Sequence, residues 1–550
     1  MLKKLRKKTW LLILPLAFGA FSFVATEDYF EISKNLEIFT SLYKELNVYY
    51  VDETQPGTLM KTGIDAMLKS LDPYTVYYPE SKIEDYQFMT TGQYGGIGAL
   101  INKVDGMITV AEPYEGFAAQ TAGLIAGDII KSIDGENIEG KEVSDISSLL
   151  KGQAGTKVML VVDRPGKGEM SFEVLRQDVQ IPDVPYYGML DDETGYVSLR
   201  SFTKTSGASV RKCILELKDQ QGMQQLVFDL RGNGGGLLRE AINIVNFFVP
   251  KGTEIVSTKG KLQEWNKTHS ALNEPIAPDL PLVVLVDGGS ASASEIVSGA
   301  LQDLDRAVII GSTTFGKGLV QQTKDINYNT KLKLTVAKYY IPSGRCIQKL
   351  DYSSREGEKV DQVADSLIQP FKTAGGRLVY DGRGIAPDLD VSNEDMSNIL
   401  GGLLRNEIIF KYATEFVQKG QGIEEPEQFD LGDNYQDFVD YALAQDFSYD
   451  TRTEKILADL KEMAEAEKYY DGAENAFAAL EKQIAPKKEE DLQRFREQIE
   501  FTVEEEIVSR YYYQKGAIRY GLTHDPYLNR AFEVFGDQYT SILSGTGADN

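Results

Sequence analysis

Between about residues 190 and 395, short apolar runs alternate with stretches of helical periodicity, and glycine-rich turns separate them. The predicted strands are Leu226–Leu230, Leu282–Val286 and Ala307–Ile310, and the predicted helices are Leu237–Phe248 and Glu295–Leu304. Strands that alternate with helices favour a sheet that is at least partly parallel. The alternation therefore predicts an α/β core.

The segments on either side of this core differ from it in composition. Residues 27–90 have apolar positions spaced by three and four, such as Ile32, Leu36 and Phe39, which indicates helices. Residues 92–178 contain short β-rich runs punctuated by glycine, which indicates a small β-dominated module. Beyond about residue 400 the sequence is helical, acidic and rich in aromatic residues.

A chain of 550 residues is long enough for about three or four domains. We predict an α/β multidomain protein, in which an α/β core carries an inserted β-rich module, an N-terminal helical segment and a C-terminal helical extension. The predicted boundaries are 1–25 for a signal peptide or membrane anchor, 26–91 for the helical segment, 92–178 for the module, 179–397 for the core and 398–550 for the extension.

The chain begins with the features of an export signal. Met1–Lys8 is strongly basic, and Trp10–Ala25 is a largely apolar run. Small residues at Ala20 and Ser22 fit a cleavage site, while the basic flank also suits an uncleaved anchor. We therefore expect the body of the protein in the cell envelope, either periplasmic or anchored to the inner membrane and facing the periplasm.

The formal net charge of −25 argues against one class of partner. An acidic surface repels phosphate backbones, so nucleic acid is not an expected ligand. The two cysteines, Cys213 and Cys346, have neither a metal-ligand spacing nor the pattern of a disulfide framework. No cofactor and no metal site is predicted.

The segment GGSASASEIVSGALQD, residues 288–303, follows an apolar strand and holds a candidate nucleophile. Ser292 lies there among alanine and glycine, where the strand turns into a helix. A substrate backbone could approach it closely, and the helix N-terminus would favour developing negative charge. The sequence Ser292-x-x-Glu295 also matches a capping box, in which the serine only satisfies helix N–H groups.

A serine nucleophile needs a base, and Lys317 is the candidate. The chain has two histidines, His269 and His524, and neither lies in a glycine-framed turn, so a Ser-His-Asp triad has little material. Lys317 stands between Gly316 and Gly318 after an apolar strand, and burial in such a turn would lower its pKa toward neutrality. An ordinary surface lysine in a turn is the alternative.

The run DLRGNGGG, residues 229–236, follows another apolar strand and has four glycines within its last five residues. A plain strand-to-helix loop explains one glycine better than four. Exposed backbone N–H groups in such a run can stabilise an oxyanion, together with the N–H that follows a nucleophile.

A second motif competes for the same lysine. Residues 311–317 fit GxxxxGK after a strand, which is the beginning of a phosphate-binding loop. Position 318 is glycine, so the hydroxyl that would hold Mg²⁺ is missing, and the following residues predict a β-hairpin where a phosphate loop would open a helix. A nucleotide hydrolase is therefore disfavoured.

Together these residues resemble the carboxyl-terminal processing peptidases, also called tail-specific proteases, over about residues 30–395. The motifs that carry the resemblance are, in chain order, LDPYTVYY, YGGIGAL, DLRGNGGG, SASASEI, the Gln302-Asp303 pair, TFGKGLVQ and GRGIAPD. The resemblance implies an ATP-independent serine endopeptidase with a Ser/Lys dyad. It also implies that the α/β core is the protease and that the inserted module is a PDZ-like domain.

The resemblance assigns roles to individual residues. The nucleophile would be Ser292 and the base Lys317, with Gln321 as the residue that orients the lysine. The oxyanion donors would be the backbone N–H groups of Ala293 and Gly236, with the preceding glycine as a close alternative.

In such enzymes the PDZ-like domain binds the C-terminus of a substrate. The N–H groups of Gly95, Gly96, Ile97 and Gly98 are expected to cradle a carboxylate, while a strand edge accepts the peptide by β-augmentation. Arg164 is a candidate for coupling peptide binding to the core. The expected partners are proteins with unstructured or apolar C-termini, and a purely scaffolding role of the module is the alternative.

Two segments depart from the family pattern. Residues of about 350–378 are polar, contain glycine and indicate a local insertion. The extension after residue 400 lies outside the shared motifs and could form a homodimer, restrict access to the site or recruit a partner. A catalytically silent peptide-binding scaffold is the remaining alternative, and the intact residues Ser292, Lys317 and Gln321 argue against it.

Overall fold

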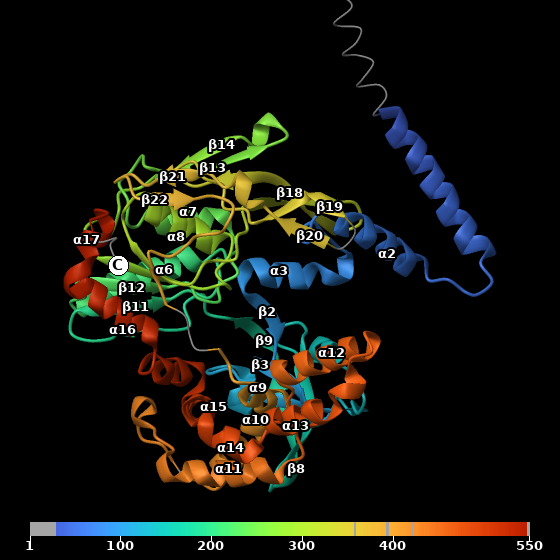
Figure 1. Cartoon of the computed structure of the whole chain (residues 1–550). Coiled ribbons are helices and arrows are strands. Elements are labelled where there is room, and N and C mark those ends of the chain that lie inside the picture. Colours follow the sequence, from blue (N-terminus) through green and yellow to red (C-terminus); the bar gives the residue numbers. More distant parts are fainter. Residues whose placement is uncertain (1–28, 357–358, 392–394, 421, 547–550) are drawn as a thin grey trace, which may run out of the picture. The chain divides into compact units, whose positions relative to one another are not determined.

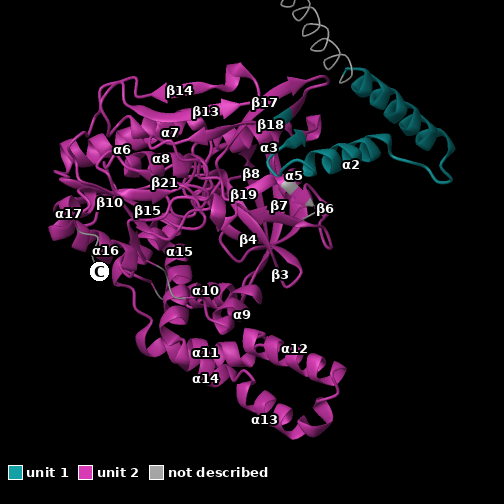
Figure 2. Ribbon diagram, turned by 45° about the horizontal axis from the view of Figure 1, so that its top comes forward, with its two compact units in different colours: residues 1–77, 332–334 teal, residues 78–331, 335–550 magenta. Residues whose placement is uncertain are grey.

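The computed structural model describes residues 29–356, 359–391, 395–420 and 422–546 (Figure 1). The chain divides into two compact units, which are residues 1–77 with 332–334 and residues 78–331 with 335–550 (Figure 2). The predicted signal segment, Trp10–Ala25, lies outside the described residues. Among the helices that are described, none combines the length and the apolar character that crossing a membrane requires.

The first unit is helical, as the apolar spacing predicts. Residues 29–49 form one helix, and α2 (Pro56–Lys69) follows with proline at its start, where the missing N–H costs no hydrogen bond. The hydroxyl of Tyr43 donates to the carbonyl oxygen of Pro56 (2.7 Å), which joins the two helices. Most apolar side chains of residues 29–49 are exposed.

The second unit begins with a β-rich module. Its antiparallel sheet has the order β3-β4-β5-β7-β8, with β6 paired to β5. The strands are β3 (Ala99–Val104), β4 (Met107–Pro113), β5 (Ile129–Ile133), β6 (Glu136–Asn137), β7 (Lys157–Arg164) and β8 (Gly168–Leu175), and the helices are α4 (Ala118–Ala122) and α5 (Val143–Leu150). Because β3 is an edge strand, its outer side is available for pairing with a peptide.

The module is framed by a helix and a two-stranded ribbon. Helix α3 (Ile83–Thr91) leads into β2 (Gln93–Gly96), which pairs with β9 (Gln177–Gln180) where the chain leaves the module. The core of the module includes Val110, Ile146 and Leu160, all fully buried.

A six-stranded sheet in the order β10-β11-β12-β15-β16-β23 forms the centre of the following domain. Its strands are β10 (Tyr187–Met189), β11 (Thr194–Ser198), β12 (Gln225–Asp229), β15 (Leu282–Val286), β16 (Val308–Gly311) and β23 (Leu389–Asp390). β10 is antiparallel to β11, and the other neighbouring pairs are parallel. The predicted α/β core with a partly parallel sheet is confirmed.

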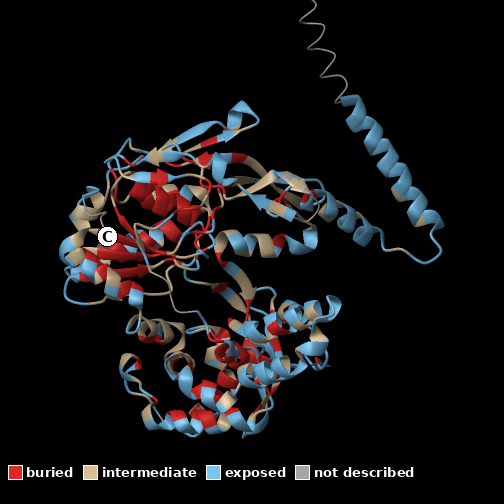
Figure 3. Ribbon diagram, viewed as in Figure 1, coloured by how far each residue is buried: buried red, intermediate tan, exposed pale blue. Residues whose placement is uncertain are grey.

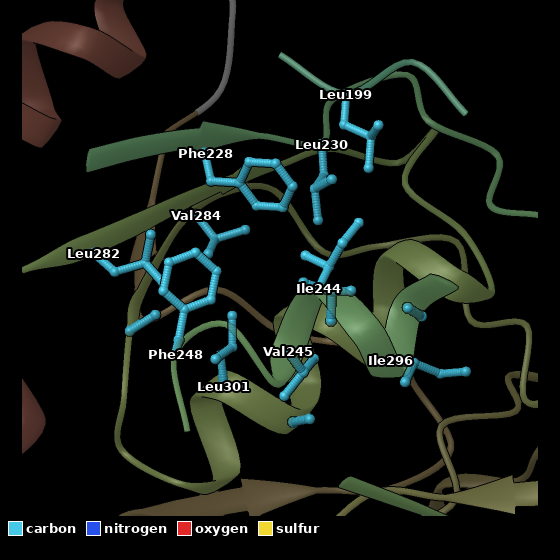
Figure 4. Close-up of a cluster of buried hydrophobic side chains, with 14 of the residues drawn as sticks. Leu199, Phe228, Leu230, Ile244, Val245, Phe248, Leu282, Val284, Ile296 and Leu301 are labelled. Carbon is cyan, nitrogen blue, oxygen red and sulfur yellow. The ribbon is translucent and has the colours of Figure 1, made fainter. Parts of the chain in front are cut away.

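Both faces of this sheet are covered, which explains why its strands are continuous apolar runs. One face packs against α6 (Ser206–Gln220), α7 (Leu238–Val245) and α8 (Ala293–Asp303). Phe228 and Val284 point into that core (Figure 4), and buried residues gather there (Figure 3). The alternate side chains, such as Val227 and Val283, enter a second core that α16 (Pro526–Glu533) and α17 (Tyr539–Leu543) close. The last helices of the chain therefore complete the α/β domain.

Smaller strands surround the sheet. β13 (Glu254–Gly260) and β14 (Lys267–Ser270) belong to a second sheet with β17 (Leu319–Ile326) and β18 (Thr330–Tyr340). The predicted insertion near residues 350–378 consists of two antiparallel pairs. These are β19 (Leu350–Glu356) with β20 (Lys359–Gln362), and β21 (Pro370–Lys372) with β22 (Leu378–Tyr380).

The rest of the C-terminal extension is helical, as predicted. Its helices are α9 (Asn398–Arg405), α10 (Ile408–Gln418), α11 (Tyr435–Ala444), α12 (Arg452–Ala466), α13 (Glu474–Ile484), α14 (Lys488–Arg494) and α15 (Arg496–Leu522). Aromatic residues such as Tyr412, Tyr435 and Phe438 are buried in the core of this bundle, so these positions serve packing.

Candidate active site

Ser292 stands at the N-cap of α8, directly after the loop that leaves β15. Its backbone has φ 55° and ψ −106°, a conformation that costs a residue with a side chain about 1–3 kcal/mol. A strained strand-to-helix turn of this kind exposes the hydroxyl of a nucleophile. The predicted capping pair with Glu295 is present, and in it the Ser292 N–H donates to a Glu295 carboxylate oxygen (2.8 Å). In the other half of the capping box, the Ser292 side chain accepts from the backbone N–H of Glu295. A hydroxyl that accepts a hydrogen bond keeps its own proton to donate, so capping and a catalytic hydroxyl are compatible.

The two neighbouring serines tie the serine segment to the glycine run. The buried hydroxyl of Ser290 donates to the carbonyl oxygen of Leu230 (2.8 Å), and that of Ser294 donates to the carbonyl oxygen of Asn233 (2.8 Å). The Ala291 N–H donates to the same Asn233 oxygen (3.0 Å). These bonds hold residues 230–236 beside the start of α8.

Gly235 comes so close to the serine that only glycine fits. A Cβ atom on Gly235 would lie 2.9 Å from the Cβ of Ser292 and 3.0 Å from the backbone nitrogen of Ala293, and the residue has φ 98°. Its N–H donates to the side-chain oxygen of Asn233 (2.9 Å). The glycine run is therefore part of the same site as the serine.

The backbone N–H groups around Ser292 differ in how they are used. The N–H of Phe202 donates to the carbonyl oxygen of Gly235 (3.1 Å), and the carbonyl oxygen of Phe202 accepts from the N–H of Leu237 (2.8 Å). These two bonds do not use the N–H of Gly236, which lies between them in the chain. Ala293 is the first residue of α8, where helix geometry provides no intrahelical acceptor for the N–H. Because the N–H of Gly235 is engaged by Asn233, this arrangement favours Gly236 over Gly235 as the partner of Ala293 in an oxyanion hole.

Lys317 lies in the loop between β16 and β17 and is half-buried. The N–H of Phe315 donates to the carbonyl oxygen of Ser290 (3.1 Å). The loop between β16 and β17 (the lysine loop) is therefore bonded directly to the loop between β15 and α8 (the serine loop). Thr314 and Ile385 exchange two bonds, from Thr314 N to Ile385 O (3.1 Å) and from Ile385 N to Thr314 Oγ1 (2.7 Å). The GRGIAPD motif thus braces the lysine loop from its other side.

Glu295 connects the serine loop and the lysine loop through its side chain. Its side chain is fully buried, and besides Ser292 it accepts from Thr314 Oγ1 (2.6 Å), Gly316 N (2.7 Å) and Lys317 N (2.9 Å). Burial raises the pKa of this carboxyl group, and the four hydrogen bonds oppose that rise. One carboxylate therefore fixes the backbone of both Ser292 and Lys317. The sequence pattern indicated only its local capping role.

Gln321 and the two histidines make their side-chain contacts outside the bonds that join the serine and lysine loops. The side-chain amide of Gln321, on β17, donates to Thr335 Oγ1 (3.3 Å). His269 lies in β14, and His524 is exposed and contacts the hydroxyl of Thr523 (2.7 Å). The residues that bond the serine and lysine loops together include neither histidine.

The Gln302-Asp303 pair belongs to a buried network at the far end of α8. Arg345 is 1% exposed and donates to Gln302 Oε1 (2.8 Å) and Asp303 Oδ1 (2.8 Å). Gln302 in turn donates to the carbonyl oxygen of Ala386 and to Asp388 Oδ1, both at 2.9 Å. The network fixes α8 to the segment that braces the lysine loop.

Arg345→Met is expected to lower the free energy of unfolding by about 3–5 kcal/mol, because Asp303 would remain buried without its cation. Urea denaturation followed by the fluorescence of Trp265 measures this, since Trp265 is the sole tryptophan of a form that lacks residues 1–25. Lys157→Met is the control, because Lys157 pairs with Glu173 at an exposed position (2.7 Å), and its loss should cost at most about 1 kcal/mol. Equal losses in the two variants would contradict the role of the network.

An apolar groove lies between the β3 edge and α5 of the β-rich module. It is a cavity of about 230 Å³, and the residues that line it include Ile97, Ala99 and Ile101 on one side and Val143 and Leu150 on the other. The outer edge of β3, which pairs with no other strand of its sheet, borders this groove.

The residues predicted to cradle a carboxylate divide between two elements. Gly95 and Gly96 lie in strand β2, where they are paired with Asp178 and Gln177 of β9. Ile97 and Gly98 form the turn from β2 into β3, with φ 74° at Gly98. The turn between the strands is thus shorter than the predicted stretch.

The side chain of Arg164 is directed into the β-rich module itself. It donates to both carboxylate oxygens of the buried Asp128 (2.6 and 2.7 Å) and to the carbonyl oxygen of Gly123 (2.8 Å). These bonds stabilise the module.

The glycine run is also bonded to the end of the chain. Arg231 donates to Asp229 Oδ2 and to Asp525 Oδ2, both at 2.6 Å, and its guanidinium lies 4.6 Å from the centre of the Tyr527 ring. Asp525 is the N-cap of α16 and accepts the Tyr527 N–H with its other oxygen (2.9 Å). The helices that close the second face of the sheet therefore also support the loop beside Ser292.

Comparison with protein-family models gives three matches along the chain. Peptidase family S41 matches residues 193–353, a PDZ domain matches residues 109–164, and the C-terminal helical domain of a probable PDZ-protease matches residues 399–535. A carboxy-terminal-processing protease of Bartonella bacilliformis is 36% identical over 319 residues, which span 57% of this chain and 73% of that protein. A probable CtpA-like serine protease of Staphylococcus aureus is 34% identical over 335 residues, which span 60% of this chain and 65% of that protein.

Among solved structures, a photosystem II D1 C-terminal processing protease is 28% identical, with a TM-score of 0.35, over 67% of this chain and 95% of that one. A PDZ domain of a carboxy-terminal protease from Vibrio cholerae, in complex with peptide, is 27% identical, with a TM-score of 0.16, over 16% of this chain and 99% of that one.

Proposed function

Because the chain belongs to the carboxy-terminal-processing proteases, serine-type peptidases of family S41 with a PDZ domain, we propose that it cleaves peptide bonds with a dyad of Ser292 and Lys317. The observation that carries this proposal is the carboxylate of Glu295, which accepts from the N–H groups of both residues (2.8 and 2.9 Å). A nucleophile and its base must be held in one geometry, and a shared buried acceptor provides this.

In the proposed mechanism, the neutral amine of Lys317 takes the proton of the Ser292 hydroxyl as the oxygen attacks the scissile carbonyl carbon. The tetrahedral intermediate places its oxyanion near the N–H groups of Gly236 and Ala293, which stabilise the charge. Lys317 then returns the proton to the leaving amine, and an acyl-enzyme remains. Water, activated by the same lysine, releases the new carboxyl terminus. Gln321 is proposed to orient the lysine side chain during these transfers.

The proposed substrates are proteins with unstructured or apolar C-termini. The groove between β3 and α5 has the apolar lining and the free strand edge that such a tail requires, and the turn at Ile97 and Gly98 offers N–H groups to the terminal carboxylate. A tail held there would deliver the preceding unfolded chain to Ser292. We propose that cleavage does not require ATP hydrolysis by this chain. The support is that strand β17 follows Lys317, where a phosphate-binding loop would begin a helix.

Amidating the C-terminus of an unfolded substrate is expected to lower kcat/KM about ten-fold, because the amide cannot make the charge-assisted bonds of a carboxylate. The assay follows cleavage of one unfolded protein by the chain without residues 1–25, in the absence of nucleotide. A short peptide that reaches Ser292 directly is the control and should lose much less. Equal rates for the free and the amidated protein would refute selection by the chain end and leave the Ser/Lys chemistry intact.

We further propose that the protein acts in the cell envelope, periplasmic or anchored to the inner membrane. The support is the basic segment followed by the apolar run at the start of the chain. Fractionation of cells that carry a C-terminally tagged form tests this, and recovery in the cytoplasm alone would contradict it.

A further inference from the structure

The apolar groove between β3 and α5 ends at a lysine. Lys151 directly follows the last residue of α5 and lines the same cavity as Ile97 and Leu150. The next residue, Gly152, donates its N–H to the carbonyl oxygen of Gly95 (3.1 Å). This bond places the end of α5 beside the strand that leads into the turn at Ile97. A cationic side chain is thus present where the terminal carboxylate of a tail is expected.

A positive charge at this end of the groove would offset the end of α5. The C-terminal end of a helix carries partial negative charge, which opposes a carboxylate placed beside it. Backbone N–H groups of the turn offer hydrogen bonds, and Lys151 adds the opposite full charge. A free chain end would gain from this charge, whereas an amidated end would not.

Helix α3 brings two groups of the kind that a tail would carry, a carboxylate and an apolar side chain, to Lys151 and the groove. The carboxylate of Asp85 lies 3.5 Å from the Nζ atom of Lys151, and the apolar ring of Phe88 lines the cavity. The Phe88 ring packs edge-on against Tyr94, with 5.5 Å between the ring centres. An acidic group and an apolar side chain, three residues apart on one helix, therefore contact Lys151 and the apolar lining of the groove, respectively.

This arrangement can be displaced at low cost. The pair of Lys151 and Asp85 is partly exposed, at 33% and 45% of the two side chains, and such pairs contribute little to stability. Asp85 has Lys82 as a second partner at 3.1 Å, so releasing Lys151 leaves it paired. Within the nine residues of α3 only Ile83 is buried.

We propose that Lys151 binds the terminal carboxylate of the substrate tail and that Asp85 on α3 holds Lys151 until a tail displaces it. The proposal rests on the tail recognition of the proposed function. It identifies the residue that reads the charge of the chain end and a contact within the protein that competes with the substrate.

The test measures dissociation constants for one unstructured peptide that ends in an apolar residue, in free and amidated forms. The full chain carries Ser292→Ala so that the peptide is not cleaved, and fluorescence anisotropy reports binding. Lys151→Met is expected to weaken binding of the free form about three-fold without changing the amidated form, which is the effect of one partly exposed charge pair. Asp85→Asn is expected to strengthen binding of the free form about two-fold. Lys157→Met, at an exposed pair with Glu173 on β7 and β8, is the matched control and should change neither form.

The possible outcomes separate the two proposals. If the Ser292→Ala chain with no other change binds both peptides equally, recognition of the chain end fails, and the role of Lys151 fails with it. If that chain prefers the free form and Lys151→Met keeps the same preference, tail recognition stands and the role of Lys151 is overturned. If Asp85→Asn leaves the affinity for the free form unchanged, competition by α3 is overturned.

Discussion

Ser292→Ala and Lys317→Ala are each expected to abolish proteolysis, with kcat/KM lower by at least about 10³-fold, while the α/β domain stays folded. Nucleophile and base act as one unit, so the double variant should be no worse than either single variant. Lys317→Arg should be equally inactive, because arginine keeps the charge but cannot give up its proton near neutral pH. Cleavage of an unfolded protein measures activity, and circular dichroism with Trp265 fluorescence measures folding.

Ser294→Ala is the matched control for this prediction. Ser294 lies two residues from the nucleophile, and its hydroxyl supports the glycine run through Asn233. Its loss should shift that loop slightly and lower kcat by about ten-fold at most, because the hydroxyl bonds only to backbone there. Activity retained by Ser292→Ala or by Lys317→Arg would overturn the dyad. A Ser294→Ala variant as inactive as Ser292→Ala would show that the serine segment acts through structure alone.

Glu295→Gln is expected to lower kcat by at least about 10²-fold and to leave KM nearly unchanged. The four donors that converge on Glu295 need an acceptor with two oxygens, and the amide group of glutamine would turn an N–H₂ toward some of them. The loops of Ser292 and Lys317 would then move apart, and a displacement of about 1 Å is enough for a 10²-fold loss. Steady-state kinetics on a peptide substrate separates kcat from KM.

Glu240→Gln separates positioning from general stability. Glu240 is also buried in the α/β domain, where its carboxylate accepts from the N–H of Gly207 (3.0 Å) and from the side chain of Asn243 (3.1 Å), both outside the loops of Ser292 and Lys317. Glu240→Gln should lower the melting temperature about as much as Glu295→Gln does, while leaving kcat within about three-fold of the unchanged chain. Equal losses of kcat in the two variants would refute the special role of Glu295.

Much of the architecture could be predicted because local patterns determine it. The apolar runs at Leu226–Leu230 and Leu282–Val286 are continuous since both faces of the sheet are covered, and this makes them easy to recognise. The S41 and PDZ matches confirm the family that the ordered motifs indicated. The roles of Ser292 and Lys317 stay predictions, now supported by the bonds that join their loops.

Other features depend on contacts that no local pattern contains. The capping box revealed Glu295, but its bonds to Thr314 and Lys317 come from a loop about 20 residues away, which only the folded sheet brings near. The bond between Arg231 and Asp525 joins residues 294 positions apart. The sequence predicts Gly95 and Gly96 in the carboxylate turn because glycine suits both turns and strand bulges, whereas pairing with β9 places them in a strand.

The most direct test of the central claim is the mass of the protein quenched in acid during turnover of an activated ester substrate. An acyl-enzyme mechanism adds one acyl group to the chain, and peptide mapping should locate it on Ser292. The Lys317→Ala variant should accumulate the adduct far more slowly. An acyl group on another residue, or cleavage of the ester without any adduct in a protein trapped during the pre-steady-state burst, would contradict the Ser292/Lys317 dyad.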